Sequence, residues 1–396
     1  MLRSAHATQS GKTLKVPSQF PTIQKAVSAA NPGDLVLIAA GRYRESVLVN
    51  TPRIVIRGAD RNAVVVDGEF KRDDGFRVIA DGVAIENLTV RGYLLNGLLF
   101  TGAFLADGST DSKQTPLIGY RASYVTAANN ALYGFYAFVA QQGQFDHDYA
   151  SGNADSGYYV GQCRKCAVVV SDSIGERNAV GYENTDASDG IAVVRSIWRR
   201  NRVGVAINSQ DTELLAPSVG VTIVGNRVEH NNNPKTPETA GAFGVGIVVA
   251  AGVKSTVARN RVTANGALGI AVTDLDHYLP LANRVEGNIV TGHESADLAA
   301  FLSGQTPGKA EGNCFSRNRF ARSFPAKIET TLSCTRSAAS LPVGRPRLAP
   351  PPPAFDYRRV PAPPQQRTMP NAPSAPVRPA VGLGQPLDVS KIPVPK

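Results

Sequence analysis

A glycine followed by alternating apolar residues recurs through the middle of the chain, and this repeat constrains the fold more than any other feature. Copies begin at six glycines: Gly134, Gly157, Gly181, Gly204, Gly246 and Gly269. Their spacings are 23, 24, 23, 42 and 23 residues. The long interval has room for one partial repeat, Val221–Val224, with loops around it. An earlier copy begins at Gly97, and 101–116 reads as an inserted loop.

The composition of each unit predicts short strands. Val, Ile, Thr and Gly dominate, and apolar residues alternate with a period of two, which excludes the helical TPR, HEAT and ankyrin repeats. A leucine-rich repeat is excluded because its regular leucines are missing. One such unit cannot bury its own apolar face, whereas stacked units form a continuous core between parallel sheets. Asparagines recur at the turns and can hydrogen-bond from rung to rung: Asn153, Asn178, Asn201 and Asn265.

The opening segment completes a resemblance to a known family. Phe20–Ile38 is followed by Gly41–Glu45, Ile54–Gly58 and Val64–Gly68. Together with the repeats, this order resembles the right-handed parallel β-helix proteins of the pectin-lyase-like superfamily, over roughly residues 14–335. The resemblance implies an all-β solenoid of rungs of about 23 residues.

The same resemblance implies an N-terminal helix that caps the open end of the solenoid. Ile23, Val27 and Ala30 would form its buried face, and Pro32 with Gly33 would end it. The family includes lyases, esterases, epimerases, hydrolases and non-catalytic binders, so the resemblance predicts a fold and leaves the activity open.

The end of the chain has a different composition. Residues 341–396 hold 16 of the 27 prolines, with 8 Lys or Arg against 2 Asp. This tail therefore carries +6 of the formal charge of +10, and the body carries +4. We predict three parts: an N-terminal extension (1–13), a β-helix domain (14–340) and a disordered Pro/Arg-rich tail (341–396).

Several features favour a secreted or cell-envelope location. Ala5-His6-Ala7 has the form of a signal-peptidase site, although no apolar stretch precedes it, so 1–13 is a candidate signal-peptide remnant. No apolar run approaches the roughly 20 residues of a transmembrane helix.

The four cysteines are an even set: Cys163, Cys166, Cys314 and Cys334. Three pairings are open, of which two local disulfides are the simplest, and four reduced thiols are the alternative. Zinc is disfavoured because the second pair is 20 residues apart.

Alignment on the repeat glycine predicts an exposed column of side chains. The first residue after the glycine should point inward and the second outward. The outward set includes Tyr136, Tyr159 and Glu183, on successive rungs about 4.8 Å apart. Two tyrosine rings beside a carboxyl group are suited to stacking on sugars, with Glu183 as a candidate acid or base. The alternative is that these side chains are merely solvated.

Two further groups are candidates for chemistry. Gln162 and Asp186 should form a neighbouring polar pair just past the strand, Gln162 as a ligand-binding and Asp186 as a catalytic candidate. Asp146-His147-Asp148 partly resembles the Asp-Pro-His-Asp/Glu motif of alginate epimerases, without its proline. His147 and Asp148 are therefore catalytic candidates. By alignment, His147 shares the turn slot of Asp172, Asn226 and Asn260, which favours a structural role.

We predict that the protein binds a polysaccharide or cell-envelope glycan and modifies it by lyase- or epimerase-like chemistry on an acidic glycan, with glycoside hydrolysis as a further option. The alternative is a non-catalytic surface rod tethered by its basic tail. An enzyme of the first kind should bring titratable groups and an Arg or Lys into one cleft. We expect a monomer with no cofactor, no bound metal and no nucleic-acid partner. Ca²⁺ held by Asp and Asn turn oxygens is the alternative to a metal-free protein.

Overall fold

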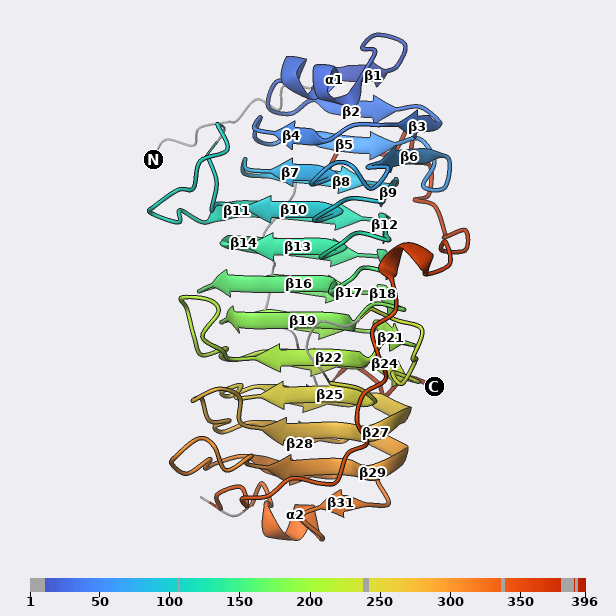
Figure 1. Cartoon of the computed structure of the whole chain (residues 1–396). Helices are drawn as coiled ribbons and strands as arrows, with labels where there is room; N and C mark the ends of the chain where they lie inside the picture. Colours follow the sequence, from blue (N-terminus) through green and yellow to red (C-terminus); the bar gives the residue numbers. More distant parts are fainter. Residues whose placement is uncertain (1–10, 106, 238–241, 336–338, 379–387, 389–390) are drawn as a thin grey trace.

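The protein is a parallel β-helix whose rungs stack along one axis (Figure 1). The computed structural model describes residues 11–105, 107–237, 242–335, 339–378, 388 and 391–396. Each rung in the middle of the body crosses three faces in turn, which we call the back, side and front sheets. The predicted solenoid is therefore confirmed, because neighbouring rungs pair in parallel on every face.

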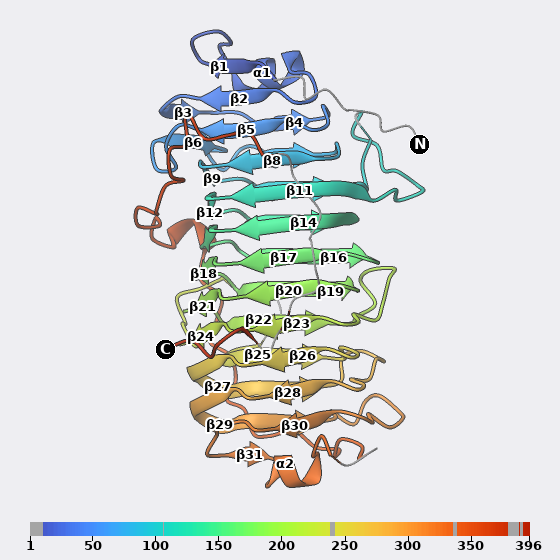
Figure 2. The same ribbon diagram turned by 180° about the vertical axis from the view of Figure 1, so that it is seen from behind.

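The back sheet, labelled in Figure 2, stacks 12 strands of the described chain in sequence order. They are β1 (Thr13–Val16), β2 (Leu35–Ile38), β5 (Val55–Gly58), β8 (Val83–Glu86), β11 (Leu117–Ser123), β14 (Ala140–Asp146), β17 (Val168–Ser171), β20 (Ile191–Val194), β23 (Thr222–Val224), β26 (Thr256–Ala258), β28 (Arg284–Glu286) and β30 (Cys314–Ser316).

The side sheet consists of short strands that follow the turn out of the back sheet. They are β3 (Gly41–Tyr43), β6 (Val64–Asp67), β9 (Thr89–Arg91), β12 (Thr126–Ala128), β15 (Tyr149–Ser151), β18 (Ile174–Glu176), β21 (Ile197–Arg199), β24 (Arg227–Glu229) and the first parts of β27 (Arg261–Thr273) and β29 (Ile289–Phe301).

The front sheet faces the viewer in Figure 1 and carries the candidate site. Its strands are β4 (Val47–Val49), β7 (Phe76–Val78), β10 (Leu98–Thr101), β13 (Phe135–Phe138), β16 (Ser156–Cys163), β19 (Val180–Ala187), β22 (Val203–Asn208), β25 (Val245–Ala250), the last parts of β27 and β29, and β31 (Ser323–Phe324).

The repeat glycines lie at the entrance to the front strands, where the next rung leaves no room for a side chain. A Cβ atom at Gly157 would lie 2.8 Å from both the carbonyl oxygen of Gly181 and Nδ2 of Asn178. At Gly181 the corresponding contacts, to the next rung, would be 2.5 and 2.9 Å. Such distances are shorter than van der Waals contact, so the close stacking of the rungs explains the recurrence of glycine.

Asparagine side chains form a ladder at the corner between the side and front sheets. Asn153 donates to Oδ1 of Asn178 at 2.9 Å, and Asn201 donates to Oδ1 of Asn231 at 2.8 Å. The predicted rung-to-rung bonding of asparagines is therefore confirmed. The ladder ends at the buried His293, whose Nε2 lies 3.1 Å from Nδ2 of Asn265.

Side chains that point inward fill the core. The residues one position after the repeat glycines are completely buried: Phe135, Tyr158, Tyr182, Val205, Ile247 and Ile270. Aromatic rings stack along the axis, as where Phe135 and Tyr158 have ring centroids 4.7 Å apart. The predicted alternation of inward and outward residues is therefore confirmed on the front sheet, and this alternation determines which side chains reach the outer surface.

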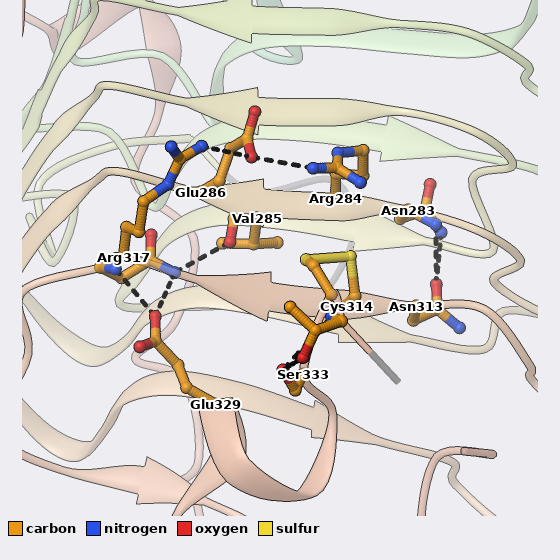
Figure 3. Close-up of a disulfide and its surroundings, with 12 residues drawn as sticks. Asn283, Arg284, Val285, Glu286, Asn313, Cys314, Arg317, Glu329 and Ser333 are labelled. Atoms are coloured by element: carbon orange, nitrogen blue, oxygen red, sulfur yellow. Dashed lines mark hydrogen bonds and ion pairs between the residues drawn. A yellow bond between two sulfur atoms is a disulfide. The ribbon is translucent and has the colours of Figure 1, made fainter. Parts of the chain in front are cut away.

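Both ends of the solenoid are capped. The helix α1 (Ile23–Ala29) is N-capped by Thr22, which accepts a hydrogen bond from the amide of Lys25, and it buries Ile23 and Val27 against the first rung. At the other end, α2 (Ile328–Thr331) follows the last rungs, and the Cys314–Cys334 disulfide ties this segment to β30. Figure 3 shows Cys314 between the Asn283–Asn313 pair and Glu286, which pairs with Arg284 and Arg317.

The described part of the tail lies against the β-helix, and the predicted disorder of the tail as a whole stays a prediction. The described part contains the 3-10 helix η1 (Tyr357–Arg359) and a turn at 370–374, and it lies along the β-helix (Figure 1). Nδ2 of Asn129 donates to the carbonyl groups of Tyr357 and Val360 at 2.8 and 3.0 Å. Proline prevents a strand but leaves carbonyl acceptors free, and side chains of the rungs bind these carbonyls.

Part of the predictions falls on residues outside the described ranges. These are residues 1–10 of the N-terminal extension and residues 379–387 and 389–390 of the tail. In the described ranges, no helix has the length and apolar character needed to cross a membrane.

Candidate functional site

The predicted column of Tyr136, Tyr159 and Glu183 lies in one cavity on the outer surface of the front sheet. The strands β13, β16 and β19 place the three residues in direct register. The cavity has a volume of about 610 Å³, and we call it the Tyr–Glu cavity. Tyr159 is only 5% exposed, so the expectation of a fully exposed column is wrong at this residue. The loop 209–220 contributes Glu213, which covers the tyrosine ring.

Three tyrosine rings gather at one end of the Tyr–Glu cavity. Tyr133 lies 4.6 Å from Tyr136 and 4.5 Å from Tyr159, measured between ring centroids. Tyr136 meets Tyr159 edge-to-face at 5.2 Å. Tyr159 is buried whereas Tyr133 and Tyr136 are half-buried, so these two are the rings that a ligand can reach. The sequence analysis missed Tyr133, although it is an aromatic residue directly before a repeat glycine.

Glu183 lies at the centre of the Tyr–Glu cavity and is held by two neighbouring side chains. Its Oε1 accepts a hydrogen bond from Nδ2 of Asn208 at 2.7 Å, and its Oε2 accepts one from the hydroxyl of Ser156. The same hydroxyl lies 3.1 Å from Oδ1 of Asp155. Burial, and then the charge of Asp155, raise the pKa of Glu183 from 4.5 to about 8.

This arrangement links two carboxyl groups through one hydroxyl. When Glu183 is protonated, it can donate to Ser156, and Ser156 can then donate to Asp155. Two carboxyl groups in such proximity do not both ionise near neutral pH, so Glu183 holds a proton there. The pair has the properties of an acid and a base placed side by side.

Glu213 is a third carboxyl group in the Tyr–Glu cavity, and the sequence analysis missed it. Its Oε1 accepts a hydrogen bond from the hydroxyl of Tyr159 at 2.6 Å. Its Oε2 is buried and has no hydrogen-bond partner in the described ranges. Burial raises the pKa of Glu213 from 4.5 to about 8. The only signal in the sequence is the spacing of 42 residues, which announces an insertion without saying where its side chains lie.

Gln162 and Asp186 hold the loop 209–220 in place. Both lie near the ends of front strands, in the same slot on successive rungs, with left-handed backbone at φ 47°. Oε1 of Gln162 accepts from the amide of Leu214 at 2.9 Å, and Oδ1 of Asp186 accepts from the amide of Gln210 at 3.1 Å. Burial raises the pKa of Asp186 to about 6. They lie outside the lining of the Tyr–Glu cavity and position the loop that carries Glu213.

His147 and Asp148 lie at a different corner, in the turn between β14 and β15. His147 stacks on Tyr124 with ring centroids 4.6 Å apart, and its Nδ1 lies 3.0 Å from Oδ2 of Asp146. The structure therefore does not bring these residues to the column of Tyr136, Tyr159 and Glu183. In the turn, His147 corresponds to Asp172, as the alignment placed it.

The alignment was wrong by one position for the asparagines of this turn. The amide of Asp148 donates to Ser173, and the chain of bonds continues through Ser196 to Asn226 and Asn260. Asp148, and not His147, is therefore the first member of this turn ladder. It is buried, and burial raises the pKa of its carboxyl group well above 3.8, with the charge of Asp146 adding to the shift.

The prediction of two local disulfides is confirmed, whereas the predictions about metal ions stay open. The disulfides Cys163–Cys166 and Cys314–Cys334 are both formed, as the simplest pairing predicted. Within the described ranges, no three or more His, Cys, Asp or Glu side chains gather in a way that could hold a metal ion. The Ca²⁺ site stays a prediction without residues assigned to it.

The lining of the Tyr–Glu cavity is acidic. Asp155, Glu183 and Glu213 line it, and no Arg or Lys does so in the described ranges. On the same outward column, Arg77 lies two rungs before Tyr136 and pairs with Asp74 at 2.6 Å. A lyase or epimerase was expected to combine titratable groups with an Arg or Lys in one cleft. The described lining of the Tyr–Glu cavity provides the titratable groups but no basic side chain.

Comparisons with known proteins define the class of the chain. The family described as "right handed beta helix region" matches residues 75–290, more than half of the sequence, so the chain belongs to this family. No protein of curated function matches the sequence.

Solved structures with low sequence identity share the fold. The A-module of mannuronan C-5 epimerase AlgE6 from Azotobacter vinelandii is similar with a TM-score of 0.52 and 16% identity, over 76% of this chain and 92% of that one. The A-module of AlgE4 from the same organism gives 0.49 and 15%, over 75% and 88%. A mannuronic acid specific polysaccharide family 6 lyase from human gut microbiota gives 0.47 and 13%, over 78% and 79%. At such identities the likeness supports the β-helix fold alone.

Proposed function

We propose that this protein binds a polysaccharide in the Tyr–Glu cavity and acts on it by acid–base chemistry. One observation carries the proposal: a cluster of tyrosine rings and a protonated carboxyl group share one cavity on the outer surface of stacked strands. The cavity volume lies within the range of about 300–1,000 Å³ that is usual for ligand sites.

The binding part of the proposal rests on the tyrosine cluster and on the geometry of the stack. Tyr133 and Tyr136 offer aromatic faces to the apolar face of a sugar ring, and their hydroxyl groups can bond sugar hydroxyls. The front sheet repeats its outward positions about every 4.8 Å, so a chain of sugars meets similar positions rung after rung. A polymer therefore fits this surface better than a single small molecule.

The chemical part rests on Glu183 and Asp155. Glu183 holds a proton near neutral pH and can deliver it to the leaving oxygen as the glycosidic C–O bond breaks, while the water that forms the new C–O bond can lose a proton to Asp155 through Ser156. Glycoside hydrolysis uses two such carboxyl groups. Lyase or epimerase chemistry on an acidic glycan, the reaction expected from the sequence, needs a cation beside the sugar carboxylate. Hydrolysis is therefore the reaction class that the lining of the Tyr–Glu cavity supports best.

A glycan array followed by a reaction screen tests the proposal. We expect Tyr136→Ala to abolish detectable binding of any glycan found. We expect Glu183→Gln to keep binding and to lower turnover by about 10²–10⁴. Glu229→Gln, which changes a carboxyl group of β24 outside the Tyr–Glu cavity, is the matched control and should change neither. Unchanged binding in Tyr136→Ala together with unchanged turnover in Glu183→Gln would refute the assignment of this site.

A secreted or cell-envelope location belongs to the same proposal. Two disulfides in one chain are typical of oxidising compartments. The rod alternative depended on a free basic tail. Described tail residues bind the rungs of their own chain, as where Nη2 of Arg202 donates to the carbonyl of Pro352. This contact favours the glycan-binding function over a tether. The monomeric state stays a prediction.

A further inference from the structure

We propose that the glycan bound in the Tyr–Glu cavity is a cationic amino-sugar polymer, recognised through its protonated amine by Glu213. The inference rests on the proposed function, because it names the substrate class of the same site. It is carried by the lining of the cavity, where carboxyl groups and tyrosine rings meet without a basic side chain in the described ranges.

The sign of the charges decides between the candidate glycans. A sugar carboxylate would enter a cavity in which every charged group of the described lining is an acid. Two like charges 4 Å apart repel by about 4 kcal/mol at the effective dielectric constant of a protein surface, and opposite charges attract by as much. Arg77, the cation on the same column, lies two rungs beyond Tyr136 and is already paired with Asp74. A uronate would therefore find no opposite charge in this lining, whereas an ammonium group could pair with the carboxylate form of Glu213.

The hydrogen-bonding capacity of the cavity points the same way. Oε2 of Glu213 is buried and has no partner in the described ranges, which is costly unless a ligand supplies a donor. A primary ammonium group has three N–H donors and no acceptor, so it matches a site made of acceptors. Glu183, in the same cavity, already has both oxygens hydrogen-bonded, to Asn208 and Ser156, so Glu213 is the group left to receive the amine.

Gly161 leaves room for the ring of Tyr159 and the carboxyl group of Glu213, since a Cβ atom there would lie 2.5 Å from Cε1 of Tyr159. A Cβ atom at Gly161 would lie 2.6 Å from Oε1 of Glu213, which is too close for an alanine without a shift of the carboxyl group. The side chains of Gln162 and Asp186 also hold the loop 209–220, because they accept hydrogen bonds from its backbone amides. The chain therefore holds the carboxyl group of Glu213 beside Tyr159 at a defined place. Burial of this carboxyl group opposes its ionisation in the free protein.

Binding of a cation should release protons. Burial holds the pKa of Glu183 and of Glu213 at about 8, so both groups are mainly protonated at about pH 6 in the free protein. An ammonium group beside Glu213 favours its carboxylate form and lowers its pKa, while Glu183 keeps the proton that its role as an acid requires. Proton release therefore distinguishes recognition of the amine from simple stacking on the rings.

Isothermal titration calorimetry at about pH 6 tests the inference. The full chain is titrated with a glucosamine tetrasaccharide, its N-acetylated form and a uronic acid tetrasaccharide, in two buffers of different ionisation enthalpy. We expect the free amine to bind at least about tenfold more tightly than the acetylated form, with release of protons. The uronic acid form should bind most weakly.

Two variants separate charge recognition from stacking. Glu213→Gln keeps the shape and removes the group that ionises on binding the amine, so it should lower affinity for the free amine about tenfold and leave the acetylated form within about twofold. Tyr136→Ala should weaken both forms equally. Equal affinity for the two forms, or tightest binding of the uronic acid, overturns the inference. If such binding is still lost in Tyr136→Ala, the proposed function stands, whereas binding of none of the glycans in the array overturns both.

Discussion

The outer surfaces of the back and front sheets carry buried carboxyl groups in opposite settings. On the back sheet, Glu86 is completely buried between Arg57, whose Nε lies 2.7 Å from Oε2, and Arg121. The tail covers this triad, and the carbonyl groups of Ala372 and Ala375 accept from Arg57 at 3.1 and 2.7 Å. The carboxylate and the guanidinium groups are therefore compensated within the chain.

In the Tyr–Glu cavity of the front sheet, Glu183 and Glu213 have no ion pair with a basic side chain in the described ranges. Glu183 is held by neutral donors, and Glu213 has one oxygen without a partner in the described ranges. The same rungs thus support both surfaces, and the difference lies in what the chain places over them. We infer that a covered, paired charge serves stability and that an uncovered acid in a cavity serves a ligand. Four predictions test this contrast.

The largest effect is expected at the back sheet. Glu86→Ala leaves two buried guanidinium groups without their carboxylate, which should lower the free energy of unfolding by about 3–5 kcal/mol. Denaturation in urea measures this change. The control is Asp172→Ala, which removes the partner of the half-exposed Arg195 and should cost less than about 1 kcal/mol. Equal losses in the two variants would contradict the contrast.

Removal of residues 346–396 should have the next largest effect. Arg57 and Arg121 lose carbonyl acceptors, and Ile392 leaves the apolar cluster on β20, β23 and β26. We expect the free energy of unfolding to fall by about 3 kcal/mol. The lost hydrogen bonds and apolar contacts destabilise the folded state, but the conformational entropy that ordering the tail costs is no longer lost on folding. Hydrogen exchange should increase on the back sheet while glycan affinity stays within about twofold. A loss of affinity would mean that the tail belongs to the site.

The pH dependence of stability should originate at the front sheet. Glu183 faces Asp155 and Glu213, and Glu213 faces Tyr159 and Asp186. Both glutamates have folded-state pKa values raised from 4.5 to about 8. At pH values between these two, the folded state therefore binds more protons than the unfolded state. Their contribution is fully present below about pH 4.5 and is lost as pH rises through about 8.

We expect the free energy of unfolding to fall by about 2 kcal/mol between about pH 5 and 8.5, less than the full shifts imply because the cavity is open to solvent. Urea denaturation at both pH values measures this change. The double variant Glu183→Gln and Glu213→Gln should remove most of the slope, and an unchanged slope would place its origin elsewhere.

The smallest effect is expected at His147. It lies at the corner between the back and side sheets, so His147→Ala should leave glycan affinity and turnover within about twofold of the parent protein. Loss of turnover in this variant, with stability unchanged, would restore the catalytic hypothesis that the sequence suggested for this turn.

Much of the fold was predictable because it repeats. The spacing of the glycines indicated the rungs, and the alternation after Gly134 and Gly157 assigned Phe135 and Tyr158 to the core and Tyr136 and Tyr159 to the surface. Each rung contacts mainly its neighbours, so a local pattern is enough to fix the register. The tail was predicted less well, because proline content shows that a segment cannot form a strand but not that its carbonyl groups will be bound.

The sequence by itself determined the stack, its inward and outward positions, and hence the column of Tyr136, Tyr159 and Glu183. Only the tertiary structure decided that Glu213 returns from the loop 209–220 to cover Tyr159, and that Tyr133 joins the rings. It also separated His147 from this site. The physical reason is that the repeat encodes contacts between neighbouring rungs. The position of an inserted loop depends instead on single hydrogen bonds to distant residues, such as the one from the amide of Leu214 to Gln162. Such contacts leave no period in a sequence.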